Sequence, residues 1–215
     1  FKGEQHNYPL DETNPFFVRD YNKCILCGRC VKACSEVQFV EAIDFAYRGF
    51  KTKVAAPYDR SLVDSTCIFC GQCVASCPVG ALTERSRISR GREWELKKVP
   101  TVCPYCGVGC NIELNVKDNR IVRVTSPINS VVNRGRLCVK GRFGFDFVHS
   151  PERLTTPLIR EGEKGEGRFR EASWEEALEL VTRRLAEIKT ESGPDSLACL
   201  ASAKCTNEEN YLIQK

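Results

Sequence analysis

Twelve of the fourteen cysteines in this chain fall into three groups whose spacing suits iron–sulfur clusters. Two groups share the pattern C-x2-C-x2-C-x3-C, and their members are Cys24, Cys27, Cys30 and Cys34, then Cys67, Cys70, Cys73 and Cys77. The third group follows C-x2-C-x3-C with a distant fourth member, and it comprises Cys103, Cys106, Cys110 and Cys138. Thiolates are the usual ligands of [4Fe–4S] clusters, and the first pattern is that of bacterial two-cluster ferredoxins. The sequence therefore predicts one-electron chemistry at three [4Fe–4S] clusters.

The first two groups form an internal repeat, because the pattern that starts at Cys24 starts again at Cys67. In two-cluster ferredoxins the fourth cysteine of each run binds the other cluster. We therefore predict one ligand set of Cys24, Cys27, Cys30 and Cys77, and a second set of Cys67, Cys70, Cys73 and Cys34. Residues 36–66 form an insertion between the two halves, which we expect to be a structured loop.

Zinc is the alternative metal for such cysteines, since it also accepts four thiolates. A zinc ribbon uses two C-x2-C pairs for each site and needs no third and fourth cysteine in one run, so the repeat favours clusters. For the third group a zinc ribbon stays open from spacing alone, because its cysteines flank a predicted β-hairpin with strands at 111–116 and 121–124.

The C-terminal third has the pattern of alternating helix and strand. Ser173 and Glu176 form a predicted capping box, and apolar residues at helical spacing follow up to Ile188. Gly193 and Pro194 should end this helix. Residues 197–201 predict a short buried strand, and 207–215 predict a second helix. This order suggests the opening of an α/β domain.

Composition narrows the class of protein. The 215 residues are 42% hydrophobic and 28% charged, which is typical of a globular chain. The formal charge of +4 would fall to roughly −2 with three clusters of about −2 each, so we expect no nucleic-acid partner. The chain has no run of 18 apolar residues, so we expect no membrane span.

The cysteines have the spacing of metal ligands rather than of disulfides, which predicts a cytoplasmic location. The chain has no methionine and begins at Phe1, so we expect a piece of a longer polypeptide.

Two strings around the third group carry a family resemblance. Residues 103–110 (CPYCGVGC) and 136–143 (RLCVKGRF) resemble the N-terminal cluster domain of the molybdenum/tungsten bis-pterin oxidoreductases. Residues 153–160 and 169–178 are similar to the segment that leads into the first pterin-binding domain of that family. Residues 202–211 are similar to formate dehydrogenases in particular. The resemblance extends from about Val18 to Lys215.

The resemblance implies an α+β chain in several parts. An N-terminal arm (1–17) precedes a two-[4Fe–4S] ferredoxin-like domain (18–84), and a linker (85–98) follows. A small β-rich [4Fe–4S] domain (99–153) comes next. The start of an α/β molybdopterin-binding domain (154–215), truncated, ends the chain.

The same resemblance implies roles for single residues. Lys140 matches the lysine between the third cluster and the pterin, and would be an electron relay and a cofactor contact. Lys204, Thr206 and Asn207 would contact the pterin. The cofactor would be Mo- or W-bis(molybdopterin guanine dinucleotide), held mostly by residues beyond 215, together with three [4Fe–4S] clusters.

The remaining cysteines have no predicted catalytic role. Cys199 is expected to be an inert core thiol. Cys205 precedes the metal-ligand stretch of formate dehydrogenases, so the metal ligand and the catalytic His and Arg are expected outside this chain.

The function that the resemblance implies is the electron-transfer portion of a formate dehydrogenase or CO2 reductase catalytic subunit. The expected partners are the remainder of that subunit, an iron–sulfur or flavin/NAD-linked electron-transfer subunit, and the substrate formate or CO2. The first alternative is an electron-wire subunit of a complex I-like or hydrogenase-type assembly without substrate chemistry. A free-standing ferredoxin-like carrier is the second alternative.

Overall fold

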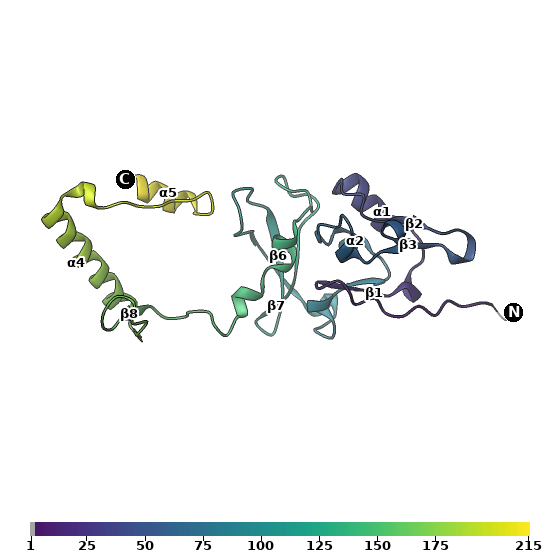
Figure 1. The fold of residues 1–215 in the computed structure, drawn as a ribbon, viewed down its shortest axis with the longest axis horizontal. Helices are drawn as coiled ribbons and strands as arrows, with labels where there is room; N and C mark the ends of the chain where they lie inside the picture. Colours follow the sequence, from purple (N-terminus) through teal and green to yellow (C-terminus); the bar gives the residue numbers. More distant parts are fainter. Residues whose placement is uncertain (1–2) are drawn as a thin grey trace. The chain divides into compact units, whose positions relative to one another are not determined.

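The computed structural model describes residues 3–215 and divides the chain into two compact units, 1–149 and 150–215 (Figure 1). The first two residues of the predicted N-terminal arm lie outside the described residues. In the described residues no helix is both long and apolar enough to cross a membrane.

The first unit begins with the cysteine repeat. Strand β1 (Phe17–Arg19) pairs antiparallel with β4 (Leu82–Glu84), which brings the two ends of the repeat together. Helices α1 (Arg29–Lys32) and α2 (Gln72–Ser76) occupy equivalent places in the two halves and contact each other (Figure 1). Each half therefore contributes one short helix directly after its C-x2-C turn.

The insertion at 36–66 is structured, as the sequence predicted. Strands β2 (Asp44–Ala46) and β3 (Lys53–Ala55) form an antiparallel pair, and short 3-10 turns follow. Ile43, Val54 and Leu62 from this segment are buried in the same core as Phe17 and Val74. The insertion thus supplies part of the hydrophobic core around the cysteines.

The second part of this unit is a three-stranded antiparallel sheet in the order β5-β6-β7. The predicted hairpin is confirmed as β6 (Asn111–Lys117) and β7 (Arg120–Thr125). Strand β5 (Lys97–Val102) was not predicted: its first two residues fall in the expected linker (85–98), and the others begin the expected β-rich domain. Its residues are exposed and include Pro100, which suits an edge strand and hides the usual strand signal. Helix α3 (Val139–Phe143) packs on β7.

The second unit contains a β8 (Leu158–Arg160) and β9 (Phe169–Glu171) pair followed by two helices. Helix α4 (Trp174–Ser192) begins and ends as predicted, and the Oγ of Ser173 accepts a hydrogen bond from the Glu176 N–H at 3.1 Å. The predicted capping box is incomplete, because the Glu176 carboxylate pairs with Arg170 instead. The second predicted helix is confirmed as α5 (Asn207–Gln214).

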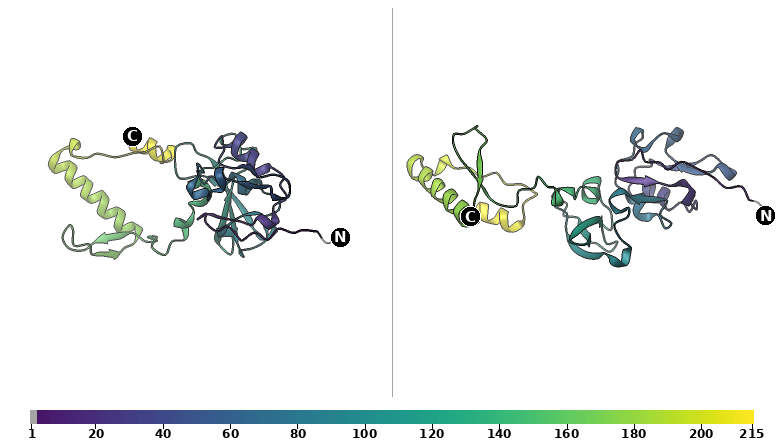
Figure 2. Two further views of the ribbon diagram at one scale, coloured as in Figure 1. Left: turned by 45° about the vertical axis from the view of Figure 1, so that its right-hand side comes forward. Right: turned by 90° about the horizontal axis from the view of Figure 1, so that it is seen from below.

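Two predictions for this unit are wrong. Residues 197–201 are extended but form no strand, and Figure 2 shows this stretch running between α4 and α5. Cys199 is exposed rather than buried in a core. Both errors share a cause: an apolar run becomes a buried strand only where a neighbouring strand satisfies its backbone groups, and β8 and β9 pair only with each other.

Candidate iron–sulfur sites

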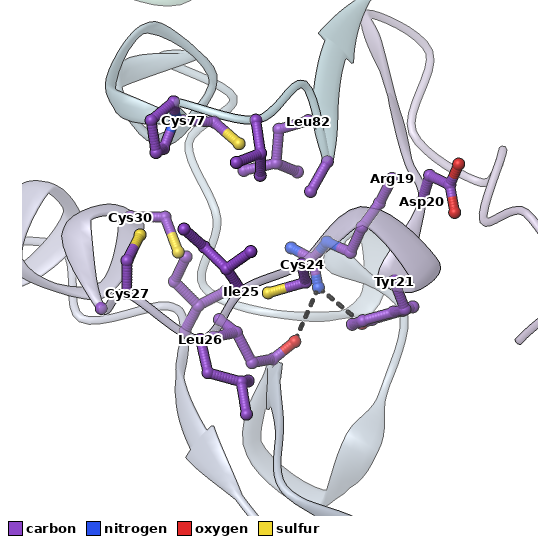
Figure 3. Close-up of a pocket in the computed structure, with 16 residues that line it drawn as sticks. Arg19, Asp20, Tyr21, Cys24, Ile25, Leu26, Cys27, Cys30, Cys77 and Leu82 are labelled. Atoms are coloured by element: carbon purple, nitrogen blue, oxygen red, sulfur yellow. Dashed lines mark hydrogen bonds between the residues drawn. The ribbon is translucent and has the colours of Figure 1, made fainter. Parts of the chain in front are cut away.

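Four thiols from the two halves of the repeat line one cavity in the first unit (Figure 3). They belong to Cys24, Cys27 and Cys30 of the first run and to Cys77, the last cysteine of the second run. The cavity is otherwise almost wholly apolar, with Ile25, Leu26, Ile43 and Leu82 among its walls. The structure thus brings together the first predicted ligand set, including its crossover member.

A second cavity is lined by Cys34 from the first run and by Cys67, Cys70 and Cys73 from the second. Phe17, Ile43 and Leu62 close it with apolar surface. The roles of the two halves are exchanged relative to the first cavity, since three cysteines come from the second run and the fourth comes from the first. The structure brings together the second predicted set as well.

The C-x2-C turns of the two halves share an unusual backbone. Leu26 and Phe69 have positive φ values of 53° and 55°, and the glycines two residues later have values of 72° and 70°. Side chains other than glycine rarely adopt this region, and alternation of this kind turns successive N–H groups toward one anion. The Phe69 N–H lies 3.4 Å from the Cys67 Sγ, and the Ala42 N–H lies 3.3 Å from the Cys34 Sγ. The positive φ values of Leu26 and Phe69 were not predicted, although the repeat places both residues two positions after the first cysteine of a run.

Burial makes these cysteines reluctant to ionise alone. It raises the pKa of the Cys30, Cys67 and Cys70 thiols, and it raises the pKa of Cys73 to about 12. A thiol must lose its proton to bind a metal. Cluster binding at these sites therefore requires positive charge nearby, which the iron atoms and buried cationic side chains would supply.

The third group of cysteines also gathers in space. Burial raises the pKa of Cys110, and the neighbouring Cys103, Cys106 and Cys138 raise it further. The Cys103 N–H donates to the Cys110 carbonyl oxygen at 2.9 Å and closes the loop between them. Cys138 stands at the N-terminus of α3. Cys106 and Cys138 are exposed, so this site is more open than the first two.

A buried polar network holds the loop that carries Cys138. The Asn133 side chain accepts from the Asn111 N–H at 3.0 Å and donates to the Ser126 Oγ at 2.8 Å and to the Arg136 carbonyl oxygen at 2.6 Å. Ser130 donates to Asn133 at 2.7 Å. This network was not predicted, because asparagine and serine in a loop give no sign of burial.

Helix α3 joins the third site to the second. Arg142 on α3 is only 2% exposed, and its Nε donates to the Cys70 carbonyl oxygen at 2.7 Å. Its Nη2 donates to the Gln72 Oε1 at 3.0 Å. Burial lowers the Arg142 pKa, and the buried carboxylate of Glu84 opposes that effect. The helix that begins at Cys138 therefore ends against the ligand loop of the second site.

The close approach depends on glycine. A Cβ atom added at Gly71 would lie 2.4 Å from the Arg142 Cδ and 2.7 Å from the Phe143 Cζ. A Cβ at Gly141 would lie 3.5 Å from the Cys103 Sγ, which is an ordinary van der Waals contact. Gly71 is therefore the glycine that lets α3 approach the second site.

The predicted cofactor contacts lie in two places. Lys140 is exposed and lines a cavity with Cys103 and Tyr105 beside the third site. Lys204, Thr206 and Asn207 lie in the second unit, where Thr206 caps α5 in a complete capping box with Glu209. All three are exposed.

The crossed arrangement of the thiols favours clusters over zinc in the repeat. Each of its two cavities is lined by three cysteines of one run and the last cysteine of the other, which is the ligand arrangement of two-cluster ferredoxins. The residues of these two sites therefore fit [4Fe–4S] clusters.

Comparison with known protein families assigns three segments. Residues 23–81 match the 4Fe–4S dicluster domain, and residues 96–150 match the molybdopterin oxidoreductase Fe4S4 domain. Residues 153–215 match the molybdopterin oxidoreductase family. Each matched iron–sulfur segment contains the cysteines of the corresponding sites.

Individual relatives give the same result. The chain is 39% identical to "Probable oxidoreductase YjgC" of Bacillus subtilis strain 168 over 97% of its length, and 38% identical to "Putative formate dehydrogenase YrhE" of the same strain over 99%. It is 35% identical to "Putative formate dehydrogenase SAR2393" of Staphylococcus aureus strain MRSA252 over 94%. The chain spans 24–25% of the length of these relatives.

Proposed function

The chain belongs to the molybdopterin oxidoreductase family, and we propose that it is the electron-transfer portion of a formate dehydrogenase or CO2 reductase catalytic subunit. The observation that carries the proposal is the crossed ligand arrangement in the two cavities of the repeat, next to a third cysteine site. Relatives named as formate dehydrogenases support the choice of substrate.

The residues proposed to hold the clusters are those the two cavities and the third group bring together. Cys24, Cys27, Cys30 and Cys77 hold the first; Cys34, Cys67, Cys70 and Cys73 hold the second; Cys103, Cys106, Cys110 and Cys138 hold the third. A bound [4Fe–4S] cluster supplies one-electron transfer. The protein contributes burial, backbone N–H groups and charge, which set how readily each site accepts an electron.

We also propose an order in which electrons pass through the three sites. Helix α3 connects Cys138 of the third site with Cys70 of the second, whereas the first cavity opens beside exposed Cys27, Ile25 and Leu26. The third site would therefore face the pterin, the second would lie between, and the first would face a partner. That partner is proposed to be an iron–sulfur or flavin/NAD-linked electron-transfer subunit.

The pterin cofactor, Mo- or W-bis(molybdopterin guanine dinucleotide), is proposed to lie mostly against the remainder of the catalytic subunit. From this chain, Lys140 would offer a positive charge between the third site and the cofactor, which lowers the electrostatic cost of negative charge there. Lys204, Thr206 and Asn207 would contact it from the second unit. We also propose a cytoplasmic location.

The test is the metal content of the native, anaerobically purified protein, measured by mass spectrometry with formate-dependent dye reduction on the same sample. We expect roughly 12 iron atoms from three clusters and near-stoichiometric Mo or W. Iron without Mo or W and without formate activity would favour an electron-wire subunit of a complex I-like assembly. Zinc in place of iron would refute the cluster assignment.

A second measurement tests Lys140. Replacing Lys140 with Ala should leave the iron content unchanged and slow reoxidation of the metal centre after formate is added. Lys164→Ala, at an exposed lysine of the second unit to which no cofactor contact is assigned, is the comparison for the loss of one positive charge. Turnover that is unchanged in Lys140→Ala would remove this residue from the relay.

A further inference from the structure

Arg19 is a buried cation that both cavities of the repeat share. It stands at the end of β1, is 6% exposed, and lines the cavity of Cys24, Cys27, Cys30 and Cys77. It also lines the cavity of Cys34, Cys67, Cys70 and Cys73. In Figure 3 its guanidinium group lies beside the first of these cavities.

The hydrogen bonds of Arg19 leave one end of the guanidinium group free. Nη1 donates to the Tyr21 hydroxyl at 2.8 Å and to the Val54 carbonyl oxygen at 3.2 Å. Nη2 is buried and has no hydrogen-bond partner in the described part of the chain. A buried polar group without a partner costs about 1–3 kcal/mol, so a retained one points to a group that binds there.

In the described residues no carboxylate lies within ion-pair distance of Arg19. Among residues 3–215 no ion pair joins it to Asp or Glu within 4.0 Å. Arg142, the other buried arginine of this unit, differs because both its Nε and its Nη2 donate hydrogen bonds, to the Cys70 carbonyl oxygen and to the Gln72 Oε1. A buried charge is stable only when something offsets it. Tyr21, Asp11 and, once ionised, Cys73 favour the charge of Arg19, and further cysteines line the two cavities that it shares.

Those cysteines come from both ligand sets. Arg19 lines the first cavity together with Cys30, and it lines the second cavity together with Cys67 and Cys73. Cys30 belongs to the first set, whereas Cys67 and Cys73 belong to the second. One fixed charge thus acts on two sites that the two halves of the repeat build separately.

We propose that Arg19 is the common counter-charge of the two repeat sites. Its positive charge raises the reduction potential of both clusters, and its Nη2–H donates a hydrogen bond to a sulfur atom in one of the two repeat cavities. This inference rests on the proposed cluster binding. Reduction of a [4Fe–4S]2+ cluster to the 1+ state adds one electron, supplied in the test by dithionite, and no proton. A nearby buried cation stabilises that added negative charge because the local dielectric is low. Arg19 is an electrostatic residue and takes no part in bond making.

The experiment is a redox titration of the full-length, anaerobically purified protein, followed by the EPR signals of its reduced clusters. In Arg19→Gln we expect both repeat clusters to become harder to reduce. At the wild-type midpoint the ratio of reduced to oxidised cluster should fall at least tenfold at each, which equals 59 mV for one electron. Arg19→Lys keeps the charge and should restore most of the shift at both clusters.

Two controls separate this role from a structural one. The third cluster, bound by Cys103, Cys106, Cys110 and Cys138, is an internal reference, because Arg19 does not line its site, and its potential should stay unchanged. Arg85→Gln removes a guanidinium group from the same module, where its Nε donates to the Asn14 carbonyl oxygen at 2.9 Å. Arg85 lines neither repeat cavity, so Arg85→Gln should leave both potentials in place.

Each other outcome has a definite meaning. Full iron content with unchanged potentials in Arg19→Gln would overturn the inference, and so would a shift at only one cluster or an equal shift in Arg85→Gln. Wild-type protein without [4Fe–4S] signals would instead overturn the proposed function.

If Arg19→Gln fails to retain iron, wild-type protein with 15N-labelled arginine provides the second test. Pulsed EPR of the reduced clusters should detect a 15N coupling that is lost in Arg19→Lys. Absence of that difference would also overturn the inference.

Discussion

The two units of this chain bury their apolar side chains very differently. In the first unit Phe17 and Val124 are 0% and 1% exposed, and buried residues surround the cysteine sites. In the second unit no residue from 150 to 215 is buried, and Trp174 and Leu178 on α4 are 66% and 58% exposed. The helices with side-chain N-caps are α4 and α5 of the second unit, whereas α1, α2 and α3 of the first unit have none, so good local structure alone does not make a core. The first unit closes because its loops converge on the cysteines.

Four paired substitutions test this comparison, each with one member in either unit. If the first unit is a closed structure built around its sites and the second presents uncovered apolar faces, the members of each pair should differ. Equal effects within the pairs would break the comparison.

The largest difference is expected between two cysteines. Cys70→Ser should remove one cluster, about four of roughly 12 iron atoms, because Cys70 lines the second repeat cavity. Cys199→Ser should keep the full iron content, since Cys199 is exposed and outside every cysteine group. Iron analysis and EPR of the two variants measure this. Equal iron loss in both would contradict the ligand assignment.

The next largest difference, in the free energy of unfolding, is expected between two leucine substitutions. Leu62 is 4% exposed in the core of the first unit, so Leu62→Ala should lower the free energy of unfolding by about 2–5 kcal/mol. Leu178→Ala on α4 should cost well under about 1 kcal/mol, because that side chain is already mostly in water. Guanidinium unfolding under anaerobic conditions measures both. A Leu178→Ala loss as large as that of Leu62→Ala would show that the α4 face is covered in solution.

Two arginines form the third pair. Arg142→Met keeps apolar volume but leaves the buried Cys70 carbonyl oxygen without its donor, which should cost about 1–3 kcal/mol. Arg170→Met removes exposed ion pairs with Glu161 and Glu176 and should leave the unfolding midpoint unchanged, because solvent screens such pairs. Guanidinium unfolding under anaerobic conditions measures the stability of both variants. Stability unchanged in Arg142→Met would mean that α3 does not depend on this contact.

The last pair consists of two glycines with nearly the same φ. Gly71 and Gly167 have φ values of 70° and 72°, so alanine adds a similar strain of about 1–2 kcal/mol at each. Only Gly71→Ala also meets Arg142 and Phe143, whereas nothing lies within 4 Å of a Cβ at Gly167. Gly71→Ala should therefore be more destabilising by about 1–3 kcal/mol of overpacking. Equal losses would show that α3 shifts freely.

Sequence patterns were most informative where the chemistry is local. The cysteine spacing predicted three groups and the crossed sets that the two cavities display. Helical periodicity and capping residues placed α4, and an alternating pattern placed the β6–β7 hairpin. The strand predicted at 197–201 does not form, and β5 was not predicted, because a strand depends on its neighbour as well as on its own residues.

By itself, the sequence determined which residues could bind metal and which faces of the helices are apolar, since both follow from side-chain type and short spacing along a chain of fixed geometry. Only the tertiary structure decided which charges lie beside the cysteines. Arg142 reaches the carbonyl oxygen of a residue 72 positions away, and Arg19 comes between two cavities built from both ends of the repeat. Such contacts arise from how segments distant in sequence pack, and no spacing rule along one segment encodes them.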